Sequence, residues 1–214
     1  MTTAKNRTST RPTSPSKQRK IPWLGIVFGV IAIALVGAIV FSSSDPIGSE
    51  FGDVAITGDP LPPFTDSSPD AAIGLVAPDL SGVDFDGQGV EIRNDGTAKA
   101  IAFLAHWCDH CQAEVPRVQE WADSGGGVPG VTVYSVTTSM NSAQPNFPPS
   151  AWLEREGWTA PVLRDDIDSS GLIAYGAGGF PFWVFVDADG KVVRRSAGQL
   201  DIPTLEAYMT EAAS

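Results

Sequence analysis

A Cys-x-x-Cys motif at the junction between an apolar segment and an amphipathic one constrains this sequence more than any other feature. Cys108 and Cys111 form the motif, and they are the only two cysteines in the chain. Residues 99–105 (KAIAFLA), directly before it, form a short apolar run that predicts a buried strand. Residues 109–123 carry apolar side chains near helical spacing, at Val115, Val118, Trp121 and Ala122. The motif is therefore expected at the start of a helix that follows a buried strand.

The rest of the C-terminal part alternates between predicted strands and helices. The β-branched residues of 131–136 (VTVYSV) predict the next strand, and an irregular insert covers residues 138–150. A hairpin turn at Asp187-Ala188-Asp189-Gly190 separates two further predicted strands. The remaining expected elements are a short helix at 152–156, a helix at about 168–175, strands at 182–186 and 191–194, and a last helix near Pro203. This alternation predicts the α/β class, with a central mixed β-sheet covered by helices on both faces.

Charge is distributed unevenly along the 214 residues. Residues 1–20 hold six of the 14 basic residues and no acidic one. The other 194 residues hold 8 basic and 25 acidic side chains, a formal charge of −17. Such an acidic body favours solubility and argues against a nucleic-acid partner, because binding a phosphate backbone needs positive charge. The basic first segment, rich in Thr, Ser and Pro, predicts a disordered tail.

An apolar run, residues 21–41, follows the basic tail and contains no charged side chain. As a helix it would be roughly 31 Å long, about the hydrocarbon thickness of a bilayer. We expect a single-pass transmembrane helix of the signal-anchor type in the cell membrane. Because no basic residue follows it before Arg93, residues 1–20 are expected in the cytoplasm and the C-terminal part outside it. A cleaved signal peptide is the alternative, although the run is longer than the ~7–15 apolar residues expected of one.

The chain after the apolar run is expected to divide into a spacer and one folded domain. Residues 42–70 are rich in Ser, Gly, Asp and Pro, a composition typical of a flexible linker. Residues 71–214 then form the domain, which has room for a single hydrophobic core.

The position of Cys108 at the start of a predicted helix has a chemical consequence. The unpaired N–H groups and the dipole of a helix N-terminus favour negative charge, and therefore the thiolate that attacks disulfides. Cys111 lies one turn later, from where its thiol can displace a mixed disulfide on Cys108. Cys108 is thus the expected nucleophile and Cys111 the resolving thiol. The alternatives are a structural disulfide, two inert buried cysteines, or a metal site that also uses His106 and His110.

Four segments resemble, in order, those of the thioredoxin superfamily, especially its membrane-anchored TlpA/ResA-like branch. The stretch AFLAHWCDHCQAEVP is similar to the active-site segment. Ala77-Pro78-Asp79-Leu80, followed by Asp86-Gly87, resembles the first strand of redoxin-type domains. GGFPFWVFVD at residues 178–187 resembles the segment with the superfamily's cis-proline, and residues 192–198 resemble its closing strand. The resemblance covers about residues 75–212 and implies a thioredoxin fold with a redox-active pair of cysteines.

The resemblance also implies roles for residues around the two cysteines. Pro181 would have a cis peptide bond, and with Phe180 and Trp107 it would contact an extended substrate peptide. Phe180 stands where Thr or Val is common, which would alter substrate choice. Glu114 would relay a proton to or from Cys111, since a partly buried carboxylate can act as an acid or a base. The alternatives are an ordinary turn proline and a solvated surface position for Glu114.

Some residues depart from the superfamily pattern. Ala102 replaces the buried Asp that thioredoxin has on the strand before the motif, which leaves Glu114 as the candidate base. Between the cysteines, a partly protonated His110 would stabilise the nucleophilic thiolate and make the pair more oxidising. Asp109 would have the opposite effect. His106 is interpreted as a surface residue beside the motif, and the alternative is that it adds to the positive field around Cys108.

These features predict an extracytoplasmic thiol–disulfide oxidoreductase that acts on thiols or disulfides of exported proteins without a cofactor. The direction stays open. A reductase would receive electrons from a membrane electron-transfer partner, as some TlpA/ResA-like proteins in cytochrome c maturation do, whereas an oxidase would introduce disulfides into secreted chains. Two alternatives remain: a thiol peroxidase, because Ala77-Pro78-Asp79 also resembles peroxiredoxin segments, and a copper-delivery module that uses the His/Cys cluster.

Overall fold

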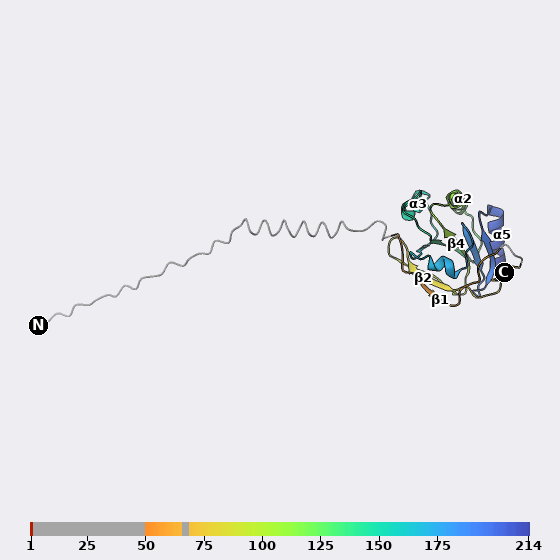
Figure 1. The fold of residues 1–214 in the computed structure, drawn as a ribbon, viewed down its shortest axis with the longest axis horizontal. Helices are drawn as coiled ribbons and strands as arrows, with labels where there is room; N and C mark the ends of the chain where they lie inside the picture. The colour runs from red at the N-terminus through yellow and green to blue at the C-terminus, as the bar shows by residue number, and fades with distance from the viewer. Residues whose placement is uncertain (2–49, 66–68) are drawn as a thin grey trace. The chain divides into compact units, whose positions relative to one another are not determined.

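The computed structural model describes Met1, residues 50–65 and residues 69–214 (Figure 1). The rest of the predicted basic tail and the apolar run at 21–41 lie outside the described residues, so their predicted roles stay predictions. No helix within the described part is both long and apolar enough to cross a membrane. Residues 50–65 and 69–214 belong to one compact unit.

A mixed sheet forms the centre of this unit. Its strands are β4 (Ala98–Leu104), β5 (Val131–Thr137), β6 (Val162–Arg164), β7 (Phe182–Val186) and β8 (Val192–Ala197). They lie in the order β6-β5-β4-β7-β8, with β4, β5 and β6 parallel and β7 antiparallel to both β4 and β8. Every residue of β4 is buried, as expected of a central strand covered on both faces. The predicted mixed sheet is confirmed, and β6 is a strand that the sequence does not signal.

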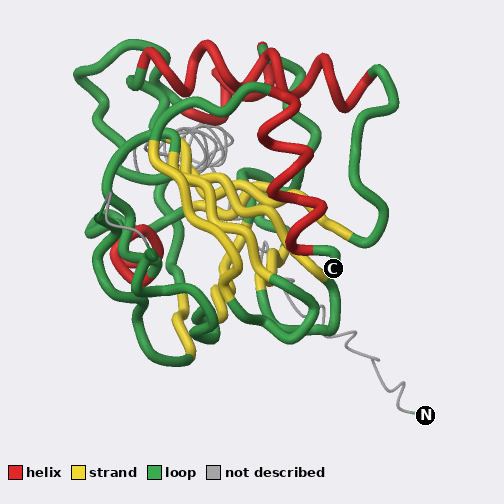
Figure 2. The backbone as a smooth tube through the Cα atoms, turned by 90° about the vertical axis from the view of Figure 1, so that its right-hand side faces the viewer, coloured by secondary structure: helices red, strands yellow, loops and turns green. Residues whose placement is uncertain are grey.

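One face of the sheet is covered by longer helices. These are α2 (Asp109–Asp123), α3 (Pro149–Arg155) and α5 (Ile202–Ala212) (Figures 1 and 2). β4 contributes Ala100 and Ala102 to the buried cluster on this face, together with Val115 of α2 and Leu205 of α5. Small side chains on the strand let the helices pack close to the sheet. The helix predicted over residues 109–123 is confirmed.

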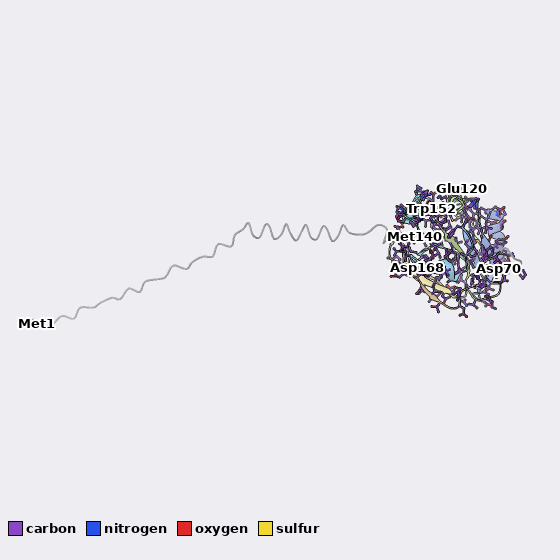
Figure 3. The ribbon with its side chains drawn as sticks, in the orientation of Figure 1. Met1, Asp70, Glu120, Met140, Trp152 and Asp168 are labelled. Atoms are coloured by element: carbon purple, nitrogen blue, oxygen red, sulfur yellow. The ribbon has the colours of Figure 1, made fainter. Side chains whose placement is uncertain are left out.

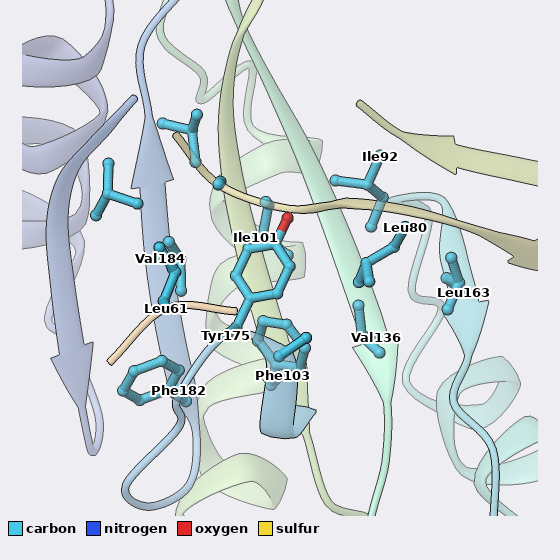
Figure 4. Close-up of a cluster of buried hydrophobic side chains, with 14 of the residues drawn as sticks. Leu61, Leu80, Ile92, Ile101, Phe103, Val136, Leu163, Tyr175, Phe182 and Val184 are labelled. Carbon is cyan, nitrogen blue, oxygen red and sulfur yellow. The ribbon is translucent and has the colours of Figure 1, made fainter. Parts of the chain in front are cut away.

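The opposite face receives the larger side chains of β4, Ile101 and Phe103. They pack in a second cluster that includes Val136 and Tyr175 (Figure 4), with the Phe103 and Tyr175 ring centroids 5.1 Å apart. The cover on this face comes from α4 (Ser170–Ala174) and an antiparallel sheet of β1 (Ala55–Thr57), β2 (Asp79–Val83) and β3 (Gly89–Ile92). The alternation of small and large side chains along β4 therefore separates the two cores.

The described chain before residue 71 belongs to the folded domain, so the prediction of a flexible linker over 42–70 is wrong for these residues. Leu61 is buried in the second cluster, and the Phe64 ring meets a ring of β7 edge-on at 5.4 Å. Asp70 accepts a hydrogen bond from Nε of the buried Arg195 at 2.8 Å. The segment's composition suggests a spacer because apolar residues are sparse, but those few find partners far along the chain. The domain therefore includes residues before the predicted boundary at 71.

Candidate active site

Cys108 is the N-cap residue of α2 and follows β4 after a short turn. Its backbone is extended, with φ −79° and ψ 118°. Its N–H donates to the Ala105 carbonyl at 3.0 Å, and its own carbonyl accepts from the Gln112 N–H at 3.0 Å. The thiol is free and half-buried. Because α2 has 15 residues and begins at Asp109, Cys108 lies at the positive end of the helix dipole.

Cys111 lies one turn along α2. It is fully buried in the cluster between the central sheet and the helices α2, α3 and α5, together with Ala102. Burial raises the pKa of the Cys111 thiol, and the nearby Cys108 and Glu114 add to the rise. A hydrogen bond with the Ala105 backbone opposes it. The two thiols of the motif therefore differ in environment, since one reaches solvent and the other is sealed beneath it.

The peptide bond between Phe180 and Pro181 is cis, which confirms the prediction and excludes an ordinary turn proline. The Cys108 thiol lies 3.7 Å from the Phe180 carbonyl oxygen and donates to it. The Pro181 carbonyl accepts the Gly198 N–H at 2.8 Å, which ties this turn to the end of β8. A second cis bond, Phe147–Pro148, precedes α3, and the sequence analysis does not anticipate it.

Two aromatic rings lie beside Cys108. Trp107 and Phe180 meet edge-on, with 5.7 Å between ring centroids. The Trp107 indole N–H donates to the Ser139 carbonyl at 2.7 Å, which fixes the ring against the 138–150 insert. Both side chains stay partly exposed. They form an apolar rim next to Cys108.

Glu114 is only 1% exposed, which excludes a solvated position on the helix surface. Its Oε1 accepts the Leu200 N–H at 2.8 Å and lies 3.5 Å from Arg117 Nη2, while Oε2 accepts the Trp183 indole N–H at 3.2 Å. Burial raises the pKa of Glu114, and the hydrogen bonds from Leu200 and Trp183 and the charge of Arg117 oppose the rise. Residues three apart on a helix share a face, so this carboxyl lies on the same side of α2 as Cys111.

His110 and Asp109, between the two cysteines, are exposed. His110 Nδ1 lies 3.3 Å from Gln199 Oε1, and the Gln199 amide donates to the His110 carbonyl at 3.1 Å. Gln199 thus holds both the ring and the backbone of His110 from the loop before α5. Nothing local in the sequence signals this contact, because the two residues are 89 positions apart.

His106 is buried, so its interpretation as a surface residue is wrong. Its Nδ1 lies 2.7 Å from the Pro145 carbonyl, and its Nε2 lies 3.1 Å from the Asn141 N–H. With Nδ1 as donor and Nε2 as acceptor, both bonds need a neutral ring. Burial lowers the pKa of His106, which favours the same neutral form. The ring therefore anchors the 138–150 insert to the motif and adds no positive charge beside Cys108.

The same contacts bear on the metal-binding alternative. Both ring nitrogens of His106 are engaged by backbone groups of the insert, which leaves neither of them for a metal ion. Across residues 50–65 and 69–214, no group of three or more His, Cys, Asp or Glu side chains is arranged to hold one. The His/Cys cluster predicted for copper delivery is not assembled in this part of the chain.

No family model matches the sequence. Comparison with characterised proteins nevertheless finds relatives that are named for thiol–disulfide chemistry. The chain is similar to the thiol-disulfide oxidoreductase ResA of Oceanobacillus iheyensis, with 24% identity over 92% of this chain and 94% of that protein. ResA of Bacillus cereus is 26% identical over 64% of this chain and 76% of that protein. A thiol:disulfide interchange protein TxlA homolog of Synechocystis is 27% identical over 55% of this chain, and the match spans only 50% of that relative's length.

Solved structures show the same fold. A thioredoxin-family thiol:disulfide interchange protein from Chlorobium tepidum has a TM-score of 0.51 and 26% identity, over 65% of this chain and 96% of that one. The MTB protein dsbF, whose structure holds mixed oxidised and reduced forms, has a TM-score of 0.51 and 25% identity over 62% and 94%. The central mixed sheet and its helices are therefore a thioredoxin-like fold, as predicted.

Proposed function

Because this chain is a TlpA/ResA-like member of the thioredoxin superfamily, we propose that it is an extracytoplasmic thiol–disulfide oxidoreductase that acts on exported proteins. The observation that carries the proposal is the pairing of a half-buried Cys108 at the start of α2 with a buried Cys111 one turn later. The Phe180–Pro181 turn lies directly against the first of these sulfurs. This geometry leaves one sulfur for the substrate and keeps the other for resolution.

The proposed disulfide exchange has two steps. The Cys108 thiolate attacks a substrate disulfide, forms a mixed disulfide and releases the first substrate sulfur as a thiol. Cys111 then loses its proton and attacks the Cys108 sulfur, which releases the second substrate thiol and leaves a Cys108–Cys111 disulfide. Two electrons pass from the protein to the substrate, and the reverse sequence oxidises a substrate dithiol.

The neighbouring residues have separate tasks in this scheme. Since burial raises the pKa of the Cys111 thiol, the second step needs a base, and Glu114 is the buried carboxyl on the same helix face. His110 adjusts the charge at the Cys108 thiolate from its exposed position. Trp107, Phe180 and Pro181 contact the extended substrate chain beside the nucleophile.

The proposed location follows from the apolar run at residues 21–41, which would anchor the protein in the cell membrane with residues 1–20 in the cytoplasm. A membrane electron-transfer partner would then restore the cysteine pair after each turnover. The proposal covers both directions of exchange, and the redox potential of the pair selects between them.

The test is the equilibrium redox potential of the full chain in detergent, titrated against glutathione buffers and read by thiol alkylation and mass. Reference proteins run from about −270 mV for thioredoxin to about −120 mV for a strong oxidant. A value near the lower end indicates a reductase, and one near the upper end an oxidase. A Cys108–Cys111 pair that never cycles contradicts the proposal.

A further inference from the structure

A hollow opens beside the redox motif, on the side away from α5. Its lining includes the Trp107 ring, Ser139 and Met140 of the insert, Phe51 of the first described segment, and Ile167 of the loop after β6. Trp107 belongs both to this lining and to the aromatic pair beside Cys108, so the hollow adjoins the active site. Figure 3 labels Met140 and Asp168 at the same edge of the domain, and Asp168 directly follows Ile167 in the sequence.

The walls of the hollow are held in place by internal hydrogen bonds. The buried Asp165 carboxylate accepts from the Thr138 hydroxyl at 2.7 Å and from the Gly171 N–H at 2.8 Å. The Ser139 N–H donates to Ser169 Oγ at 3.2 Å. These bonds join the start of the insert to the loop that carries Ile167. The hollow is therefore a preformed feature, bounded by two tied loops.

Several backbone groups around the hollow already form hydrogen bonds within the protein. The Ser139 carbonyl accepts from Trp107, the Asn141 N–H donates to His106, and the Asn141 carbonyl accepts from the Gln144 N–H at 3.0 Å. By contrast, the Ile167 side chain is 74% exposed and has little apolar cover. The lining is mixed, with the side chains of Asn141, Ser142 and Gln144 beside those of Phe51, Trp107, Met140 and Ile167. The apolar part of this lining gains by covering an apolar group of a bound chain.

We propose that this hollow is a subsite for an apolar side chain of the substrate polypeptide, close to the cysteine that reacts with Cys108. Side chains of an extended peptide repeat on one side every second residue, about 7 Å apart, so the side chain in question lies within two residues of that cysteine. The 138–150 insert, anchored by His106, is the wall that sets this preference. The subsite rests on the proposed function, because it binds the substrate of that same reaction.

Two synthetic peptides test the subsite with the full, reduced chain. Each carries one cysteine in a mixed disulfide with glutathione, flanked by Leu in one peptide and by Ser in the other. Attack of Cys108 on the peptide sulfur releases glutathione, and Cys111 then releases the peptide thiol. The readout is the second-order rate of protein oxidation, with oxidised glutathione as a substrate that lacks the apolar group.

We expect the Leu peptide to react about 10-fold faster than the Ser peptide, the discrimination typical of an apolar pocket. Ile167→Asp removes this preference, so that the two peptides react at similar rates. Ile173→Asp is the matched control, because Ile173 is also exposed, at 65%, but does not line the hollow. Met140→Ser gives a second, uncharged probe that is expected to reduce the preference.

Equal rates for the two peptides, or equal effects of Ile167→Asp and Ile173→Asp, overturn the subsite and leave the oxidoreductase intact. Failure of the reduced chain to react with either peptide and with oxidised glutathione overturns the proposed function and the subsite with it. The two failures are thus distinguishable in one set of measurements.

Discussion

The turn before Cys108 and the first turn of α2 after it each carry a histidine, and the two have opposite environments. His106 is buried and engaged at both ring nitrogens, whereas His110 is exposed and its ring lies 3.3 Å from Gln199 Oε1. The first joins the insert to the motif, and the second is the residue for which we propose a charge effect on the Cys108 thiol. Two histidines beside the same cysteine motif therefore differ in burial and in the partners that hold them.

The largest effects are expected at the two sulfurs themselves. Cys108→Ser removes the nucleophile and abolishes exchange, whereas Cys111→Ser permits the first step and traps a mixed disulfide. Mass spectrometry of the full chain after reaction with a peptide disulfide separates the two results. Turnover by Cys108→Ser, or no adduct on Cys111→Ser, would show that the exposed and buried thiols have other roles.

The next effect is expected on the buried side of α2. Glu114→Gln removes the proposed base, and we expect release of the second product to slow by about 100-fold, within the range of general acid–base catalysis. The normal rate should rise with pH through the raised pKa of Glu114, and the variant should lose that rise. Stopped-flow measurement of mixed-disulfide decay gives both. Glu120→Gln on the exposed surface of the same helix is the control, and an equal slowing there would remove Glu114 from the mechanism.

The comparison of the two histidines is sharpened by their effects on stability. His106→Asn breaks at least one buried hydrogen bond and leaves space in the core, so we expect a loss of about 2–3 kcal/mol in the free energy of unfolding. His110→Asn, at an exposed site, should change it by less than about 0.5 kcal/mol. Urea denaturation of both variants measures the difference, and comparable losses would contradict the contrast.

The smallest effect is a pH dependence from His106. Burial lowers the pKa of its folded form, so the unfolded chain binds the proton more readily. The stabilisation is present above the unfolded value of about 6.5 and is lost as pH falls through that value toward the lower folded one. Unfolding free energies between pH 7.5 and about 5 should therefore fall less in His106→Asn than in the unaltered chain. His110→Asn should retain the loss of unfolding free energy that protonation of His106 causes. A smaller loss in His110→Asn than in His106→Asn would assign this pH dependence to His110 instead.

Local patterns were enough for the elements around the motif. The apolar run before Cys108, the helical spacing after it and the hairpin at Asp187–Gly190 predict β4, α2, β7 and β8 within a few residues. The short strands β1, β3 and β6 were not anticipated, because three or four residues carry too little periodicity to be recognised. β1 pairs with β2 and β6 pairs with β5 across long connections, which a local pattern does not record.

The amino-acid pattern alone predicts the position of the two cysteines at a strand-to-helix junction and the order of the elements around them. Both depend on spacing between near neighbours, which a linear pattern records. The fold was needed to show that Glu114 and His106 are buried, that Gln199 reaches His110, and that the described chain before residue 71 packs into the core. Burial and long-range hydrogen bonds depend on which distant segments cover a residue, and no local spacing encodes that.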